Sequence, residues 1–238
     1  MLLFYIRHGK PTYDPDELTP LGKRQAEAVA RRLSCYGIDK VYSSTSNRAL
    51  QTSIPTCEIL GKEPEMLDFS NEKYAWQEFT VVRNDGKREW GYANADMRRI
   101  FLSDDMYRLG NRWYEHPVFA GTGFKDGAER IARKTDEFLA SLGYIHNREG
   151  RFYTVSEPKY DRVALFAHEG FGQAFFSALL DIPYPIYSTH FTMSHSGMSV
   201  VEFEERGGVV IPRVLELSCD AHLYAERLPT KYNDKIYI

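Results

Sequence analysis

LLFYIRHG, at residues 2–9, is the stretch of sequence that decides the fold of this chain. Its five apolar residues predict a buried β-strand at 2–6, which should end where Arg7, His8 and Gly9 follow. An arginine binds phosphate oxygens with a fork of N–H groups, a histidine offers a nitrogen nucleophile, and a glycine lets the backbone pass close to a substrate. The tip of this strand is therefore a candidate phosphoryl site.

A second apolar run ends in the same way. Residues 163–167 predict another buried strand, which leads into His168 and then into the apolar helix pattern of residues 171–180. Ligands of open α/β sheets bind outside the carboxyl ends of the strands. We therefore expect His168 to share one pocket with Arg7 and His8, although these residues lie far apart in the sequence.

A polar turn between these two strands carries a further cation. SSTSNRALQT, at residues 43–52, contains several candidate helix N-caps and places Arg48 in the first helical turn. The amides at the start of a helix favour an anion, and an arginine there strengthens this preference. We expect Arg48 to join the same pocket.

The rest of the chain alternates between strand and helix patterns. Thr19 and Pro20 form a good N-cap and first turn, and Gly61 ends the second predicted helix. The predicted elements are a helix at 20–35, a strand at 40–43, a helix ending near 60, helices near 94–109 and 126–142, a polar connection at 146–160, and a hairpin of strands at 198–203 and 209–217.

Several motifs in this order resemble those of the histidine phosphatase superfamily, the phosphoglycerate-mutase-like proteins. They are RHG at 7–9, the LTxxGxxQA pattern at 18–26, SSTSNRALQT at 43–52, Gly127-Ala-Glu129 at the start of a helix, and the late His168. The resemblance covers most of the chain except about residues 75–125. It implies an α/β fold, a three-layer sandwich whose mostly parallel central sheet is flanked by helices. We expect one domain over residues 1–238, in which residues 75–125 are inserted as a cap segment.

The resemblance also implies a phosphohistidine mechanism. It assigns the nucleophile to His8, the phosphate-binding arginines to Arg7 and Arg48, and the second pocket histidine, both catalytic and phosphate-binding, to His168. No metal and no cofactor are expected, because the arginines supply the positive charge that magnesium supplies in other phosphoryl-transfer sites.

The proton donor to the leaving group is a choice between two carboxylates. Glu72, in Asn71-Glu72-Lys73-Tyr74, resembles the acidic residue of the mutase branch and is the first choice. Glu78 competes, because many phosphatases of the family carry a Trp-Glu pair just beyond their acid. Where the family commonly has Thr or Ser two residues after the glycine, this chain has Pro11, which cannot donate a backbone hydrogen bond. Thr12 is the candidate to replace it as a phosphate ligand.

These residues favour a metal-independent phosphomonoester hydrolase. A phosphoglycerate-type mutase is an alternative that uses the same covalent chemistry, but Lys10-Pro11-Thr12-Tyr13-Asp14 replaces the sequence that the mutase branch carries after RHG. A non-catalytic module that only binds a phosphorylated ligand is the other alternative. A mutase would return the phosphoryl group to its substrate, whereas a binding module would not turn over at all.

Composition agrees with an ordinary soluble enzyme without selecting one, and the small phosphorylated substrate that we expect follows from the motifs. The chain has 238 residues, 43% of them hydrophobic, and a net charge of -3, so no nucleic-acid surface is expected. The apolar N-terminal run is too short to span a membrane or to direct export. Three cysteines without metal-ligand spacing indicate reduced thiols in a cytoplasmic protein, and a homodimer is left open. The aromatic and arginine side chains of residues 75–125 are expected to select the substrate.

Overall fold

The computed structural model describes residues 1–230, and their contacts gather into two compact units. The first unit contains Met1–Asn71, Pro158–His168 and the residues from Met193 on, and the second contains Glu72–Glu157 and Glu169–Thr192. Residues 75–125 lie in the second unit. The expectation of one domain with an inserted cap stays a prediction, and its last residues, 231–238, lie outside the described part.

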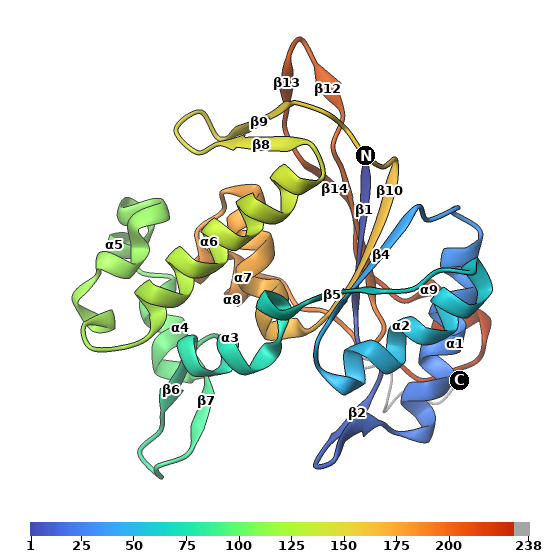
Figure 1. Ribbon diagram of the computed structural model, residues 1–238. Helices are drawn as coiled ribbons and strands as arrows, with labels where there is room; N and C mark the ends of the chain where they lie inside the picture. Colours follow the sequence, from blue (N-terminus) through green and yellow to red (C-terminus); the bar gives the residue numbers. More distant parts are fainter. Residues whose placement is uncertain (231–238) are drawn as a thin grey trace. The chain divides into compact units, whose positions relative to one another are not determined.

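The first unit is built on a six-stranded sheet of order β14-β11-β1-β10-β4-β5 (Figure 1). Strands β1, β10, β4 and β5 pair in parallel, whereas β11 and β14 are antiparallel additions at one side. The strands are β1 (Leu2–Arg7), β4 (Lys40–Ser44), β5 (Glu65–Leu67), β10 (Arg162–Ala167), β11 (Met198–Glu202) and β14 (Arg213–Cys219). The predicted α/β fold with a mostly parallel central sheet flanked by helices is confirmed.

Two long helices cover one side of this sheet. α1 (Pro20–Ser34) begins after Thr19, whose side chain accepts a hydrogen bond from the amide of Gly22, as the N-cap prediction requires. α2 (Asn47–Leu60) ends at Gly61, which adopts the left-handed conformation common after helices. Apolar side chains from α1 and α2 pack against those of β1, β4, β10 and β11 in one buried cluster. A short helix, α9 (Ala221–Ala225), packs against α1.

Two small hairpins complete the first unit. β2 (Pro11–Tyr13) pairs with β3 (Asp16–Leu18) directly after the RHG motif. β12 (Glu205–Arg206) pairs with β13 (Val209–Val210) between the two antiparallel strands of the sheet. The predicted terminal hairpin is therefore present as β11 and β14, and the residues between them pair with each other as β12 and β13.

The second unit is mainly helical and differs from the sequence prediction in two places. The single helix expected near 94–109 is two helices, because Ser103 caps a new one with its side chain. The connection expected at 146–160 contains a β-hairpin, which its polar residues had concealed. The elements are α3 (Glu72–Glu78), β6 (Thr80–Val82), β7 (Arg88–Trp90), α4 (Ala95–Phe101), α5 (Asp104–Leu109), α6 (Phe124–Ser141), β8 (Tyr144–Asn147), β9 (Phe152–Val155), α7 (Glu169–Leu180) and α8 (Tyr184–His190).

Aromatic rings form the core of the second unit. Trp113 is only 3% exposed and packs on Tyr184, Phe119 and Phe124, with ring centroids 5.1 to 6.0 Å apart. Several arginines of residues 75–125 pair with acidic side chains of the same segment: Arg83, Arg99, Arg108 and Arg112. The buried rings therefore belong to the core of the unit, whereas these four arginines form ion pairs at its surface. Among the helices of residues 1–230, none combines the length and apolar character needed to cross a bilayer.

Candidate active site

The two motif histidines follow neighbouring strands and lie next to each other. Arg7, at the end of β1, is in register with Ala167, at the end of β10, and the amide of His8 donates to the carbonyl oxygen of Ala167 at 3.0 Å. The parallel pairing therefore brings His8 and His168 to the same edge of the sheet, with their ring centroids 5.2 Å apart. This is the juxtaposition that the sequence predicted.

The hydrogen bonds of His8 fix its tautomer. Its Nδ1 lies 2.7 Å from the carbonyl oxygen of Gly9, which can only accept, so Nδ1 carries the proton. Its Nε2 then has a free electron pair, which accepts a hydrogen bond from Nε of Arg48 at 3.3 Å. His8 is only 2% exposed. His8 thus presents a neutral, oriented nitrogen to the pocket.

Arg48 reaches the pocket from the first turn of α2. Its Nη1 forms an ion pair with Asp16 at 2.8 Å, and the other carboxylate oxygen of Asp16 accepts from the amide of Asn47 at 3.0 Å. Asp16 therefore holds both the arginine and the start of the helix. The guanidinium is buried beside His8, where it can bind an oxygen of a phosphoryl group.

Arg7 is the second buried guanidinium of the pocket. Its Nη1 donates to the carbonyl oxygen of Met193, and its Nη2 lies 3.1 Å from Nε2 of His195. A guanidinium has only donors, so it donates to the imidazole through a nitrogen that is unprotonated. These two contacts orient the guanidinium of Arg7 at the end of β1.

His168 is held by two serines, one at the end of β4 and one in the polar turn that follows it. Its Nε2 lies 2.9 Å from Oγ of Ser44 and 3.2 Å from Oγ of Ser46. The hydroxyl group of Tyr5 donates to the carbonyl oxygen of His168 at 2.6 Å and fixes its backbone. Both serines belong to the quoted SSTSNRALQT motif, which therefore supplies partners for His168 as well as Arg48.

The electrostatic environment keeps both imidazoles neutral. Burial lowers the pKa of His8 well below its usual value, and His168 and the two guanidinium groups lower it further. Burial likewise holds the pKa of His168 well below its usual value, with Arg48 and Arg7 adding to the effect. A pocket with buried guanidinium groups and neutral imidazoles is suited to a multiply charged anion.

Gly9 has a packing role that differs from the predicted one. A Cβ atom at Gly9 would lie 2.5 Å from the carbonyl oxygen of Gly22, and one at Gly22 would lie 2.2 Å from that of Lys10. The loop after β1 therefore presses on the first turn of α1, and only glycine fits at this contact. The amide of Gly9 also donates to Oγ1 of Thr52 at 3.0 Å, which ties the loop to α2.

The two candidate acids have different surroundings. Glu72 begins α3, and its carboxylate accepts hydrogen bonds from the amides of Gly170 at 2.9 Å and Phe171 at 3.2 Å. These amides follow His168 by two and three residues in the chain. Glu78 instead forms a two-pronged ion pair with Arg130, with both N–O distances 2.6 Å. Glu72 therefore binds the start of α7, Glu78 is paired with Arg130, and the choice of Glu72 as the acid stays a prediction.

Thr12 lies in the β2–β3 hairpin and not with the buried side chains around His8. It is exposed, and its hydroxyl group donates within the hairpin to the carbonyl oxygens of Pro15 at 2.9 Å and Glu17 at 3.3 Å. Nothing in these contacts supports the predicted phosphate-binding role of Thr12.

The amino-acid sequence matches the family model of the histidine phosphatase superfamily (branch 1) over residues 3–213. The chain belongs to the histidine phosphatase superfamily. A curated relative from Hydrogenobacter thermophilus, named "Putative phosphoserine phosphatase 2", is 24% identical over 153 residues, which make up 60% of this chain and 68% of the relative. The expectation that the chain is a phosphatase of this superfamily is confirmed.

Solved structures of phosphatases share the fold of this superfamily member. A mycobacterial glucosyl-3-phosphoglycerate phosphatase in complex with VO3 has a TM-score of 0.58 and 20% identity, and the match covers 92% of this chain and 99% of that one. A mutant phosphoserine phosphatase of Entamoeba histolytica in complex with phosphoserine has the same TM-score and identity, with 93% and 98% covered.

The sequence analysis missed two side chains that contact the arginines near His8 in this histidine phosphatase. Asp16, the partner of Arg48, lies in a short hairpin that carries no motif. His195, the partner of Arg7, belongs to none of the family motifs in the sequence. The one available signal for His195 was its place before β11, the strand that pairs with β1.

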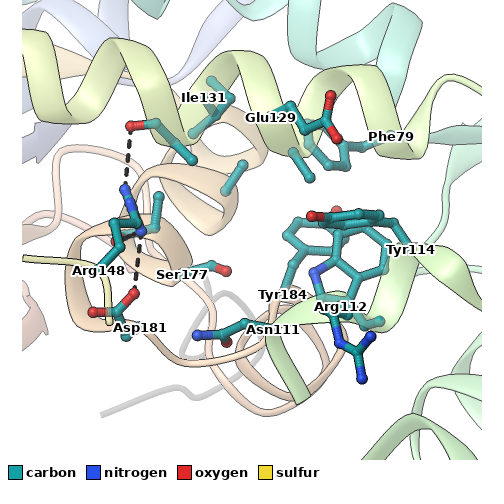
Figure 2. Close-up of a pocket in the computed structure, with 15 residues that line it drawn as sticks. Phe79, Asn111, Arg112, Tyr114, Glu129, Ile131, Arg148, Ser177, Asp181 and Tyr184 are labelled. Atoms are coloured by element: carbon teal, nitrogen blue, oxygen red, sulfur yellow. Dashed lines mark hydrogen bonds and ion pairs between the residues drawn. The ribbon is translucent and has the colours of Figure 1, made fainter. Parts of the chain in front are cut away.

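A separate cavity of about 290 Å³ lies within the second unit of this histidine phosphatase (Figure 2). Figure 2 shows Arg148 and Asp181 at one end and the rings of Tyr114 and Tyr184 at the other. None of the side chains around His8 lines this cavity. Within residues 1–230, no three His, Cys, Asp or Glu side chains are arranged to hold a metal ion.

A buried ion cluster closes one end of the cavity. Arg148 donates through all three of its nitrogens to Asp136, Asp181 and two backbone carbonyl oxygens. His146 lies between the same two carboxylates, 2.8 Å from each. Burial alone would lower the pKa of His146, but its hydrogen bonds to Asp136 and Asp181 outweigh this and raise it. Asp136 and Asp181 thus balance the charges of Arg148 and His146, so this cluster is not a good binding site for a phosphate.

Proposed function

We propose that this chain hydrolyses small phosphomonoesters, without a metal ion, through a phosphohistidine intermediate on His8. The observation that carries the proposal is the pair of hydrogen bonds of His8, with Nδ1 donating to Gly9 and Nε2 facing Arg48. A buried imidazole that is kept neutral, oriented and adjacent to guanidinium groups has the properties of a nucleophile for a phosphoryl group.

The first step transfers the phosphoryl group to the enzyme. Nε2 of His8 attacks phosphorus, the bond to the ester oxygen breaks, and the leaving alkoxide takes a proton from Glu72. Arg48 moves its hydrogen bond from Nε2 to a phosphoryl oxygen, and Arg7 and His168 stabilise the others. Binding of the anion favours protonation of His168, since its charge opposes the effect of the guanidinium groups.

The second step returns the enzyme to its starting state. Ionised Glu72 takes a proton from a water molecule, whose oxygen attacks phosphorus and breaks the bond to Nε2 of His8. The products are inorganic phosphate and neutral His8. Glu72 is favoured over Glu78 for this role because the carboxylate of Glu78 is occupied by Arg130.

The substrate class we propose is a small phosphomonoester that carries a carboxylate. Support comes from the relatives: one solved phosphoserine phosphatase is in complex with phosphoserine, and the same enzyme is also known in complex with 3-phosphoglyceric acid. Phosphoserine, 3-phosphoglycerate and a phosphomonoester without a carboxylate should therefore be compared as substrates, and the first two should have the higher kcat/KM.

Two measurements test the mechanism. The first is hydrolysis of p-nitrophenyl phosphate in the presence of EDTA. The second is detection of the phosphoryl group bound covalently to the enzyme, after the reaction is stopped without acid. We expect turnover with the chelator present and a phosphoryl label that is stable in alkali and labile in acid. His8→Ala should abolish both while leaving the melting temperature near that of the wild type, because little core volume is lost. Hydrolysis by His8→Ala would contradict the proposal.

The two alternative functions predict other results. A mutase would carry the phosphoryl group without hydrolysing the ester, and it would isomerise phosphoglycerate after priming with a bisphosphate. A binding module would bind phosphate but show neither a covalent phosphoryl group nor turnover.

A further inference from the structure

We propose that His195 is a positioning residue of the phosphate pocket, whose neutral imidazole accepts a hydrogen bond from Arg7 and holds the guanidinium toward the phosphoryl group. The inference rests on the proposed function, because that function assigns Arg7 to the phosphate. Nη2 of Arg7 lies 3.1 Å from Nε2 of His195, and the ring centroids of His195 and His8 are 5.6 Å apart. His195 therefore borders both the nucleophile and one of its cations.

The chemistry of the two groups fixes the direction of the hydrogen bond. A guanidinium group has only donors, so Nε2 of His195 must be the acceptor and its proton must lie on Nδ1. Nη1 of the same Arg7 donates to the carbonyl oxygen of Met193, two residues earlier. One short segment thus holds both terminal nitrogens of Arg7, which orients the plane of the guanidinium before the substrate arrives.

The segment that carries His195 is itself anchored on both sides. The amide of Ser194 donates to Oγ of Ser218 at 2.7 Å, and the amide of Ser196 donates to the carbonyl oxygen of His8 at 3.1 Å. Ser196 is fully buried with a φ of 56°, a left-handed conformation that a serine adopts only when its surroundings impose it. The backbone on both sides of His195 is therefore fixed, and its ring is aimed at Arg7.

The experiment compares two substitutions that separate an acceptor from a space-filling side chain. His195→Gln keeps an uncharged oxygen acceptor at a similar reach, whereas His195→Leu fills the space without one. Isothermal titration with inorganic phosphate measures the Kd of each variant, and His190→Ala serves as a matched control, because His190 is an exposed histidine nearby in the sequence. We expect the Leu variant to bind phosphate about 10-fold to 100-fold more weakly, and the Gln variant to stay within about 3-fold of the wild type.

A double-mutant cycle then tests whether His195 acts through Arg7. In an Arg7→Lys background the fork that His195 holds is gone, so His195→Leu should add less than about a 3-fold loss of phosphate affinity. Equal losses in both backgrounds, wild-type affinity in the Leu variant, or a Gln variant as weak as the Leu variant would each overturn the inference. If the Leu variant does not fold, His195→Ala replaces it in both backgrounds.

These outcomes are distinct from a failure of the proposed function. Phosphate affinity requires no turnover, so an inactive wild-type chain with the expected pattern of Kd values would refute the hydrolase and keep the role of His195. An active phosphatase with unchanged affinity in all His195 variants would refute the positioning role alone.

Discussion

Replacing each candidate acid by its amide separates the roles of Glu72 and Glu78. In Glu72→Gln the side-chain oxygen can still accept from the amide of Gly170, so the fold should be retained, but the proton for the leaving group is lost. A general acid contributes about 10²-fold to 10⁴-fold to a rate, and we expect kcat with phosphoserine to fall by that amount.

Glu78→Gln should instead cost stability. Both oxygens of Glu78 contact Arg130 at 2.6 Å, and the two side chains are only 17% and 21% exposed. Removing one partner of such a pair costs about 1 to 3 kcal/mol, which lowers the melting temperature of a chain of this size by roughly 2 to 10 °C. The kcat of this variant should remain within about 3-fold of the wild type.

The leaving group supplies an internal control for this comparison. The phenolate of p-nitrophenyl phosphate departs without much protonation, whereas the alkoxide of phosphoserine needs a proton. The loss in Glu72→Gln should therefore be much smaller with the aryl ester, measured as kcat at saturating substrate alongside thermal melts. A large, leaving-group-dependent loss in Glu78→Gln with a near-normal Glu72→Gln would refute the assignment, and equal losses with both esters would show that Glu72 is not the acid.

The structure also predicts two pH dependences of stability and the effect of one substitution on kcat. Burial lowers the pKa of His222 to about 4, so about 3 kcal/mol of stability should be lost as the pH falls from about 6.5 to 4, and His222→Gln should flatten this part of the melting curve against pH. The pKa of His146 is raised, so the pH dependence of its contribution is opposite. The stabilisation that it provides is complete below about pH 6.5 and is lost at higher pH, and His146→Asn should remove this loss of melting temperature at high pH. Gly170→Ala would place a methyl group 2.3 Å from Trp90 and 2.7 Å from the carboxylate of Glu72, so kcat with phosphoserine should fall, and an unchanged kcat would show that the position of Glu72 is not critical.

The elements around His8 were predictable because each depends on local sequence. Unbroken apolar runs gave β1 and β10, and the parallel pairing of neighbouring strands placed His8 and His168 at one edge of the sheet. The position of Arg48 in the first turn of a helix was predictable because the SSTSNRALQT motif contains the residues that start helices. Sequence order and strand direction were therefore sufficient to predict that Arg48 and His168 meet at His8.

The features that the sequence did not predict depend on contacts between segments far apart in the chain, or on a side chain that can end one helix and begin another. Asp16 reaches its arginine from a three-residue strand and His195 from a loop, neither long enough to show periodicity, so only the folded chain reveals these contacts. Ser103 broke a predicted helix because its hydroxyl group caps the next one, a choice that periodicity does not detect. The reason for Gly9 was also hidden, since its partner is the backbone of Gly22 in α1.

The histidines and arginines that surround the ring of His8 all come from the first unit of the chain, whereas both candidate acids come from the second. On the proposed mechanism, the phosphoryl group would be bound by residues of the first unit, and the proton for the leaving group would come from the second. Substitutions over residues 79–157 leave both candidate acids and the residues around His8 in place, and we expect them to change which phosphomonoester is accepted.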